Sequence, residues 1–245
     1  MFSREIRNQI SVNTHSSICI RGEKVVYIDP INIANAPHDA DLILITHPHF
    51  DHFSPKDIKK LLQADTVIVA PKSIAKLVKL CTGKTPVAVL PAQNLTLCGI
   101  PVETIAAYNK GNFTHMKMMN WVGYVLTLGE TRIYITGDTD VTPESSAVPC
   151  DILMLPVSGG MYTMNARQAA EMTNQIQPHP VIPVHYGALL GGKNAPKEFR
   201  AGVAAGIETD ICDTVYNRLM IRQYLLLIPL VLLCCILGYG ISLFM

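Results

Sequence analysis

The sequence predicts an α/β fold in which two β-sheets pack face to face with helices on the outside. Short apolar runs alternate with helical patterns between residues 42 and 90. A second series of strands, joined by tight turns, follows between residues 95 and 136. Each of these β-rich halves is followed by helical sequence. With 245 residues, the chain is long enough for one such domain with a sizeable core, which we place at residues 1–215.

The first half is expected to open with three short strands separated by turn residues, at residues 6–12, 17–21 and 24–28. An irregular loop follows to residue 40. Ser54 and Pro55 then have the pattern of a helix start, with serine as the N-cap and proline at the first helical position. Around this helix we expect alternating elements, namely strands at 42–45, 66–70 and 87–90 and a helix at 73–80.

The second half is expected to begin as a meander with turns at Gly99 and Gly129. Its strands are predicted at residues 95–97, 100–107, 121–128 and 132–136. A strand at 152–156, a helix at about 165–176 and a strand at 180–184 complete the domain.

The segment LILITHPHFDH, residues 42–52, carries a dense group of potential metal ligands. An apolar strand is followed by three imidazoles and a carboxylate, namely His47, His49, Asp51 and His52. Zinc and its neighbours in the transition series accept such ligands. In an extended loop His47 and His49 point the same way and can bind one ion, whereas Asp51 and His52 can reach a second. The alternative, a polar helix start with incidental histidines, does not explain so dense a group.

Two later strand ends lead into polar residues. Residues 132–136 lead into Gly137-Asp138-Thr139-Asp140, and residues 180–184 lead into His185-Tyr186-Gly187. An aspartate beside a glycine that lets the backbone come close can bridge two cations. An aspartate in an ordinary turn is the alternative for Asp138. His179 is flanked by prolines, and we expect it in a solvent-exposed turn.

The pattern His-X-His-X-Asp-His after a hydrophobic strand resembles the signature of the metallo-β-lactamase superfamily. The resemblance covers about residues 5–210 and implies a four-layer αββα sandwich with one or two metal ions at the edge between the sheets. It also implies that Asp138 is the bridging ligand and that His185 is the last metal ligand. Three segments, at residues 107–109, 137–140 and 181–187, closely resemble a poorly characterised bacterial and archaeal subgroup.

The chain departs from the superfamily pattern at one ligand. Most two-metal members place a third histidine for the first ion after the strand that corresponds to residues 100–107, and here that place holds Tyr108-Asn109. His115 can take its place as the ligand. Alternatively, Tyr108 or Asn109 lines the substrate pocket while the other ligands and solvent hold the first ion, or only the second ion binds.

His15 lies in the first predicted hairpin turn, Thr14-His15-Ser16-Ser17. The lactonase-like branch of the superfamily has a similar Gly-His-Ser or Gly-His-Ala element, which implies a position near the metal site. A lone histidine in a hairpin turn is otherwise usually a surface residue. Both interpretations stay open at this point.

Composition excludes several classes of protein. Net charge is +1 and charged residues make up 16% of the chain, so no basic face indicates nucleic-acid binding. The seven cysteines are odd in number and lack a Cys-X-X-Cys pair, which favours a reducing compartment over a disulfide framework. The first ten residues lack the apolar core of a secretory signal.

Residues 224–245 contain no charged side chain. As a helix these residues would span about 33 Å, enough for a bilayer core of about 30 Å. We therefore expect a single-pass C-terminal membrane anchor within residues 216–245. Because Arg218 and Arg222 precede this run and no basic residue follows it, the positive-inside tendency places the catalytic domain in the cytoplasm. A tail packed against a partner or a second subunit, as in a homo-oligomer, is the alternative.

These features predict a metal-dependent hydrolase in which metal-bound hydroxide attacks a phosphoester or lactone-type small-molecule substrate. One or two Zn²⁺ ions are expected, with Mn²⁺ or another divalent metal as the alternative. Asp51 would orient the water as well as bind metal. The nearest named activity is that of the branch typified by ascorbate-6-phosphate lactonase. The alternatives are a membrane-associated phosphodiesterase that resembles N-acyl-phosphatidylethanolamine phospholipase D, and a non-enzymatic metal-binding scaffold or sensor.

Overall fold

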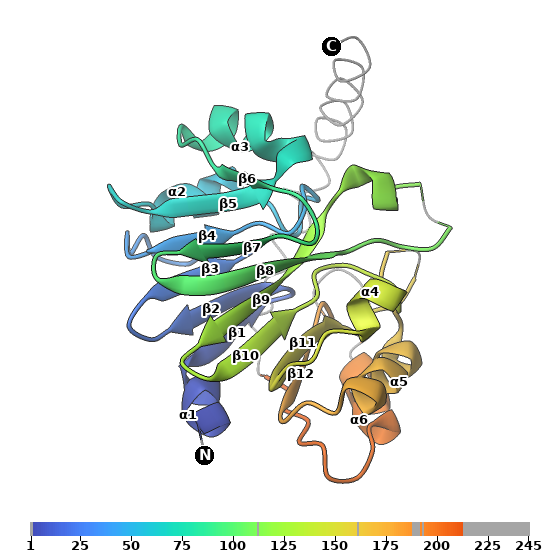
Figure 1. Ribbon diagram of the computed structural model, residues 1–245. Helices are drawn as coiled ribbons and strands as arrows, with labels where there is room; N and C mark the ends of the chain where they lie inside the picture. Colours follow the sequence, from blue (N-terminus) through green and yellow to red (C-terminus); the bar gives the residue numbers. More distant parts are fainter. Residues whose placement is uncertain (1, 112, 161, 188–191, 193, 213–245) are drawn as a thin grey trace.

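Two six-stranded sheets pack face to face, and helices cover the outer face of each sheet (Figure 1). This computed structural model describes residues 2–111, 113–160, 162–187, 192 and 194–212. The strand order is β1-β2-β3-β4-β5-β6 in the first sheet and β12-β11-β10-β9-β8-β7 in the second. The four-layer α/β sandwich predicted from the sequence is confirmed.

The strands match the predicted strands closely, except at the N-terminus. The first sheet contains β1 (Ile10–Thr14), β2 (Ser17–Arg21), β3 (Val25–Ile28), β4 (Leu42–Leu44), β5 (Val67–Pro71) and β6 (Val87–Val89). The second contains β7 (Asn94–Leu97), β8 (Ile100–Ala106), β9 (Val122–Leu128), β10 (Thr131–Ile135), β11 (Ile152–Pro156) and β12 (Val181–Val184).

Helices cover the outer faces of the sheets, except for α1, which packs at the end of the core between them. The helices are α1 (Phe2–Gln9), α2 (Pro55–Leu61), α3 (Ala75–Thr82), α4 (Pro143–Ser146), α5 (Ala166–Ile176) and α6 (Ala195–Gly202), with 3₁₀ turns η1 (Lys72–Ile74) and η2 (Lys117–Met119). The predicted start of α2 is confirmed, because the Ser54 side chain accepts the N–H of Asp57 and Pro55 opens the helix. In α5, Asn165 and Gln168 form a reciprocal capping box.

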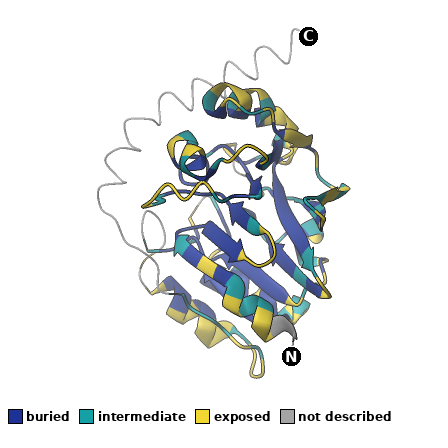
Figure 2. Ribbon diagram, turned by 90° about the vertical axis from the view of Figure 1, so that its left-hand side faces the viewer, coloured by how far each residue is buried: buried dark blue, intermediate teal, exposed yellow. Residues whose placement is uncertain are grey.

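Strand β4 is apolar throughout because it is buried on both faces. Leu42 and Leu44 pack in the core between the two sheets, whereas Ile43 packs on the outer side with Ile58 of α2 and Val78 of α3. A central strand with a core on each face reads as a continuous apolar run. Figure 2 shows the same layering, with buried strands inside and exposed residues along the outer sides of the helices.

The N-terminal segment differs from the prediction. We predicted a strand at residues 6–12, but residues up to Gln9 form α1 and the strand begins at Ile10. The run from Arg7 to Gln9 is polar and lacks the alternation that a half-buried strand requires. Arg7 secures the helix end by pairing with Asp210 and donating to the carbonyl of Ile10. Helices α4 and α6 were also not predicted.

The predicted C-terminal anchor falls outside the described residues and stays a prediction. Among the residues that the structure describes, no helix combines the length and the apolar character needed to cross a bilayer.

Chain direction brings distant polar loops to one edge of the sandwich. Strands β3, β4 and β5 are parallel, as are β10, β11 and β12, so their carboxyl ends gather there. The β1–β2 turn reaches the same edge because Ile18 is paired with Ile28 at the end of β3. Bonds between the sheets fix the edge: the Tyr124 hydroxyl donates to the Ile45 carbonyl at 2.7 Å, and the Val122 N–H donates to the Thr46 carbonyl at 3.3 Å.

Replacing Tyr124 with phenylalanine should destabilise the domain. Tyr124 is fully buried, so its loss leaves the Ile45 carbonyl without that donor in a dry core. We expect a fall of about 1–3 kcal/mol in the free energy of unfolding, measured by urea denaturation. The matched control is Tyr134→Phe, on the neighbouring strand, because that buried hydroxyl forms no hydrogen bond within the described residues. Equal losses in the two variants would contradict a specific role for the bond between the sheets.

Candidate metal centre

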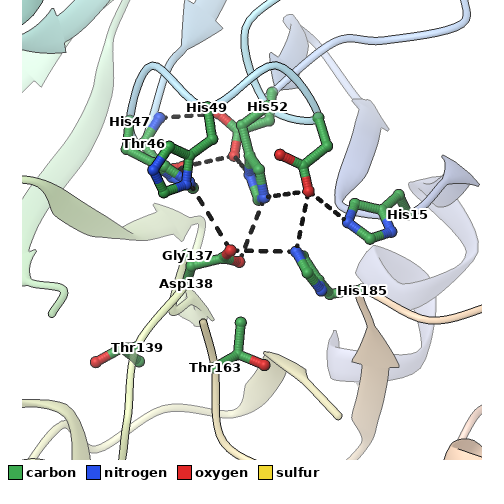
Figure 3. A network of polar contacts seen from close by, with 12 residues as sticks. His15, Thr46, His47, His49, His52, Gly137, Asp138, Thr139, Thr163 and His185 are labelled. Atoms are coloured by element: carbon green, nitrogen blue, oxygen red, sulfur yellow. Dashed lines mark hydrogen bonds and ion pairs between the residues drawn. The ribbon is translucent and has the colours of Figure 1, made fainter. Parts of the chain in front are cut away.

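Two groups of four potential ligand side chains lie at this edge, and a third group, Asp29, His47 and His52, overlaps them (Figure 3). The first cluster consists of His47, His49, His115 and Asp138. The second cluster consists of His15, Asp51, His52 and His185. Within each cluster, one potential ligand atom from every residue lies within 4.8 Å of those of the others. All six predicted metal-binding residues, together with His15 and His115, are thus brought together.

Asp138 belongs to the first cluster and also contacts the second. One of its oxygens, Oδ1, lies 3.3 Å from Nε2 of His52, and the other, Oδ2, lies 3.1 Å from Nε2 of His185. Oδ2 is also 3.8 Å from Nε2 of His47 in the first cluster. A single carboxylate therefore faces imidazoles of both clusters, as Figure 3 shows. This position is the one that a bridging ligand requires.

Several buried polar atoms of the two clusters have no hydrogen-bond partner within the described residues. They are Nδ1 of His15, Nε2 of His52 and of His185, Oδ1 of Asp138 and both ring nitrogens of His115. The carbonyl of Ala107 lies near the His115 ring, but without the geometry of a hydrogen bond. Burying such atoms unpaired is costly, and a divalent cation would satisfy them. The side chains present therefore fit a metal ion.

Asp29 and Thr46 orient two of the histidines. Nδ1 of His52 donates to Oδ2 of Asp29 at 2.7 Å, and the same carboxylate accepts the backbone N–H and the hydroxyl of Thr46, at 2.8 and 2.6 Å. Because the Thr46 hydroxyl donates to Asp29, its oxygen is free to accept from Nδ1 of His47, 2.9 Å away. Both imidazoles are thus held so that Nε2 faces the centre.

Ser158 has the same role for His185. Its hydroxyl lies 2.8 Å from Nδ1 of His185 and 3.2 Å from the hydroxyl of Thr163. With Nδ1 occupied, Nε2 of His185 is the nitrogen that points at Asp51 and Asp138. Hydrogen bonds of this kind fix the tautomer and the ring orientation of metal-binding histidines.

Burial and mutual contact set the charge states of these groups. Burial, reinforced by the neighbouring His185, lowers the pKa of His15 to about 4, and burial next to His49 lowers that of His115 to about 3. Burial alone would raise the pKa of Asp138, but His185 and His52 hold it well below its usual value. Neutral imidazoles beside ionised carboxylates are the form in which these groups bind a cation.

His185 responds differently from His15. Burial disfavours its charged form, but Asp138 and Asp51 outweigh this effect and raise the pKa of His185 to about 9. The same carboxylates, with Asp29, raise the pKa of His52 well above its usual value. The carboxylates thus favour positive charge at these two imidazoles, and a bound cation would supply that charge in place of protons.

Three residues of the site have left-handed backbone conformations, with φ of 54° at His15, 45° at Asp29 and 58° at His185. Such angles are uncommon for residues with a side chain and occur often at functional sites. Gly137 also has a positive φ, and an added Cβ there would lie 3.2 Å from Cβ of Thr46. The predicted close approach of the backbone beside Asp138 is confirmed.

Tyr108 and Asn109 belong to neither cluster. The Tyr108 hydroxyl donates to Glu144 at 2.8 Å, and Nδ2 of Asn109 donates to Oδ1 of Asp140 at 3.1 Å. The N–H of Asn109 also donates to the carbonyl of His115 at 2.9 Å. These contacts brace the loop that carries His115 against the segment that follows Asp138. A role for Tyr108 or Asn109 in binding substrate stays a prediction.

His15 lies in the metal centre, whereas His179 lies outside it. His15 is buried, and its Nε2 is 3.0 Å from Oδ2 of Asp51, so the interpretation as a surface residue is wrong. His179 precedes β12 and is exposed, as predicted. It lines a hollow with Arg4 and Arg7, and this hollow contains none of the predicted ligands.

Sequence reasoning missed the residues that orient the ligands, namely Asp29, Thr46 and Ser158, and also Trp121, whose ring centroid lies 4.5 Å from that of His115. Asp29 had one signal in the sequence. It ends a strand directly before the ligand-bearing strand, and an aspartate there lies beside the start of the histidine loop if the two strands are parallel neighbours.

Comparison with known proteins identifies the family. Residues 9–185 match the family described as "Beta-lactamase superfamily domain". A UPF0173 metal-dependent hydrolase from Thermococcus onnurineus is 30% identical over 199 residues, which cover 76% of this chain and 88% of that protein. The chain belongs to the UPF0173 metal-dependent hydrolase family of this superfamily. A family relative from Thermococcus kodakarensis is 28% identical over 198 residues, with the same coverage.

Solved structures agree with this assignment. The crystal structure of a putative metal-dependent hydrolase from Parabacteroides distasonis is 27% identical and has a TM-score of 0.70, with 84% of this chain and 93% of that chain covered. The chain is thus a metal-dependent hydrolase with the metallo-β-lactamase fold and a centre of histidine and aspartate side chains. The predicted superfamily is confirmed.

Trp121 offers a direct test of the first cluster. It is the only tryptophan of the chain, and its ring centroid lies 4.5–5.2 Å from those of His47, His49 and His115. Adding Co²⁺ to the metal-free protein should quench its emission, because a paramagnetic ion would bind next to the indole. His115→Ala should raise the Co²⁺ concentration for half-quenching by at least about tenfold. His179→Ala is the matched control, and an unchanged midpoint in His115→Ala would show that His115 is not a ligand.

Asp29→Asn should weaken metal binding without removing a ligand. The two oxygens of Asp29 accept hydrogen bonds from His52 and Thr46, whereas an amide has only one acceptor oxygen and cannot accept all of them. We expect a loss of about 10–100-fold in metal affinity, measured by competition with a chelator. Asp41→Asn serves as control, because Asp41 accepts the Val25 N–H at the opposite end of the same strand. A similar affinity loss in both variants would attribute the effect to general destabilisation.

Proposed function

We propose that this protein binds two divalent cations, one in each cluster with Asp138 between them, and hydrolyses a phosphoester or lactone-type small molecule. The observation that carries the proposal is the position of Asp138, whose oxygens face His47 on one side and His52 and His185 on the other. His115 is proposed as the third histidine of the first ion. We favour Zn²⁺ for an imidazole-rich set of this kind, with Mn²⁺ as the alternative.

A divalent cation in such a site supplies Lewis acidity and lowers the pKa of water, so that a nucleophile forms at neutral pH. Asp51 is the residue we propose to orient that water. Its Oδ2 lies 3.0 Å from Nε2 of His15, 3.4 Å from Nε2 of His185 and 3.8 Å from Nε2 of His52. Burial alone would raise the pKa of Asp51, but these imidazoles hold it well below its usual value. An ionised, directed carboxylate can hold a water molecule and accept its proton.

His15 is proposed as a positioning residue for Asp51. Its Nε2–H donates to the carboxylate, and its backbone carbonyl accepts the N–H of His185 at 3.1 Å. His15 thereby links two ligands of the second cluster that come from different sheets. Because its pKa is lowered to about 4, its imidazole stays neutral at physiological pH and adds no positive charge of its own.

The uncharged run at residues 224–245 favours a second candidate, a membrane-associated phosphodiesterase of the phospholipase D type. A chain held at a bilayer would meet lipid substrates at high local concentration. The third candidate, a scaffold or sensor, would bind metal without turnover.

Asp51→Asn separates the enzyme from the scaffold. If Asp51 directs the nucleophile, this variant should lose at least about 100-fold in kcat on whichever substrate the unaltered chain hydrolyses. The measurement combines elemental analysis of metal per chain with a hydrolysis screen of bis-aryl phosphodiesters, lactones and phospholipids. Exposed Asp65 provides the control variant, Asp65→Asn. Two ions per chain with no turnover on any of the three classes would favour the scaffold over the hydrolase proposal.

Deleting residues 223–245 should release the protein from membranes. The deletion removes the whole uncharged run, so we expect the shortened chain in the supernatant after ultracentrifugation of a cell lysate, and the full chain in the membrane pellet. Metal content of the shortened chain is the control for correct folding. Continued sedimentation of a metal-loaded shortened chain with membranes would refute the anchor.

A further inference from the structure

We propose that one end of the domain docks on a bilayer surface that contains anionic phospholipids. The surface is formed by η1, α3 and the loop at residues 107–121. We call it the α3–η2 surface and define it by six exposed side chains, namely Lys72, Lys76, Lys79, Leu80, Phe113 and Met118. The inference does not depend on the substrate or on hydrolysis.

Charge is strongly segregated in this part of the chain. Residues 66–129 contain one acidic residue, Glu103, but six lysines: Lys72, Lys76, Lys79, Lys84, Lys110 and Lys117. Glu103 pairs with Arg132 and so neutralises none of these lysines. Within the described residues, Lys72, Lys76 and Lys79 form no ion pair. Their charge is available to anionic headgroups.

Apolar side chains are exposed in the same part of the chain. The large apolar residues that are exposed among the described residues all fall within it, namely Leu80, Val87, Leu90, Phe113 and Met118. Leu80 and Phe113 are 83% and 84% exposed, and Met118 is 61% exposed. Exposed aromatic and aliphatic side chains in a lysine-rich part of the chain are typical of surfaces that insert into the interfacial region of a bilayer.

The elements that carry these residues touch one another. The hydroxyl of Ser73 in η1 donates to the carbonyl of Met119 in η2 at 2.9 Å. Along α3, Lys76, Lys79 and Leu80 are spaced so that they share one face, opposite the buried Val78. Figure 1 places α3 at one end of the molecule, and Figure 2 shows the exposed residues along its outer side.

A bilayer fits this surface better than an acidic protein or a nucleic acid does. Either of those partners would complement the lysines but would leave Leu80, Phe113 and Met118 in water. Insertion into a bilayer removes these side chains from water while the lysines reach lipid phosphates. The chain also contains a 22-residue run without charge, at residues 224–245, that would hold the domain near a membrane. The loop of Phe113 carries His115 as well, so docking would place this ligand loop at the lipid surface.

The test is fluorescence of the full chain carrying Phe113→Trp, with vesicles of brominated phosphatidylcholine with or without phosphatidylserine. The emission of Trp121 is subtracted with the unaltered protein, since this residue is buried. We expect bromine quenching of the new indole, stronger when phosphatidylserine is present. The matched control is Glu171→Trp on α5, whose side chain is exposed outside the surface and should not be quenched.

Lys76→Glu and Lys79→Glu, added to Phe113→Trp, test the electrostatic part. Each reversal should shift the equilibrium away from the docked state by about fivefold or more, and quenching should fall accordingly. The proposal is overturned if Phe113→Trp is quenched no more than Glu171→Trp. It is also overturned if soluble heparin without lipid lowers the emission of the new indole as much as the vesicles do, because the partner would then be an acidic macromolecule. Failure of the anchor proposal would be seen in sedimentation, and failure of the hydrolase proposal would be seen in turnover. Neither result alters the comparison of quenching between Phe113→Trp and Glu171→Trp.

Discussion

The carboxylate of Asp138 joins the two sheets in one charged centre, because it contacts histidines that follow strands of both sheets. His52 follows a strand of the first sheet, whereas Asp138 and His185 follow strands of the second. Taking an ionised carboxylate out of water is expensive unless opposite charge compensates it. His52 and His185 face this carboxylate, and the mutual attraction raises their pKa values and lowers that of Asp138. A cation would supply positive charge in place of protons and satisfy the same carboxylate.

Chain direction explains why this contact forms. Within each sheet, neighbouring strands run parallel next to the site, so the loops that follow β3, β4, β10 and β12 emerge at the same edge. The backbone there is held in uncommon conformations by tertiary bonds. His15 and His185 both have left-handed angles, and the N–H of one donates to the carbonyl of the other. Such strain persists where packing on all sides determines the conformation.

Most of the fold could be predicted from the sequence because many strands contribute alternate side chains to two different cores. Such strands are apolar on both faces and are therefore easy to recognise. Continuous apolar runs such as residues 42–45 and 152–156 identify strands that are buried on both sides. The N-terminal segment was predicted wrongly, because α1 is fixed by Arg7 and Asp210, which are far apart in sequence. A local pattern cannot report such a contact.

The metal ligands were easier to predict than the residues that orient them. His47, His49, Asp51 and His52 occur close together in sequence, and their chemistry is apparent from residue type alone. Asp29, Thr46 and Ser158 each orient one histidine through one hydrogen bond. The histidine lies elsewhere in the chain for Asp29 and Ser158, and for Thr46 the bond depends on the side-chain rotamer. The sequence left three alternatives for the missing histidine. We propose His115 among these, because one of its ring nitrogens lies within 4.8 Å of potential ligand atoms of His47, His49 and Asp138.

The loop at residues 107–121 connects the metal centre to the molecular surface. Its inner side supplies His115, and its outer side presents Phe113 and Met118 to solvent. Side chains near both ends of the loop tie it to the segment that follows Asp138: Tyr108 bonds to Glu144, Asn109 bonds to Asp140, and Lys117 pairs with Glu144. A contact that fixes Phe113 and Met118 also restricts the position of His115, since all three residues belong to one short stretch of backbone. Docking of the α3–η2 surface would then favour metal binding in the first cluster, and metal binding would favour docking by the same factor.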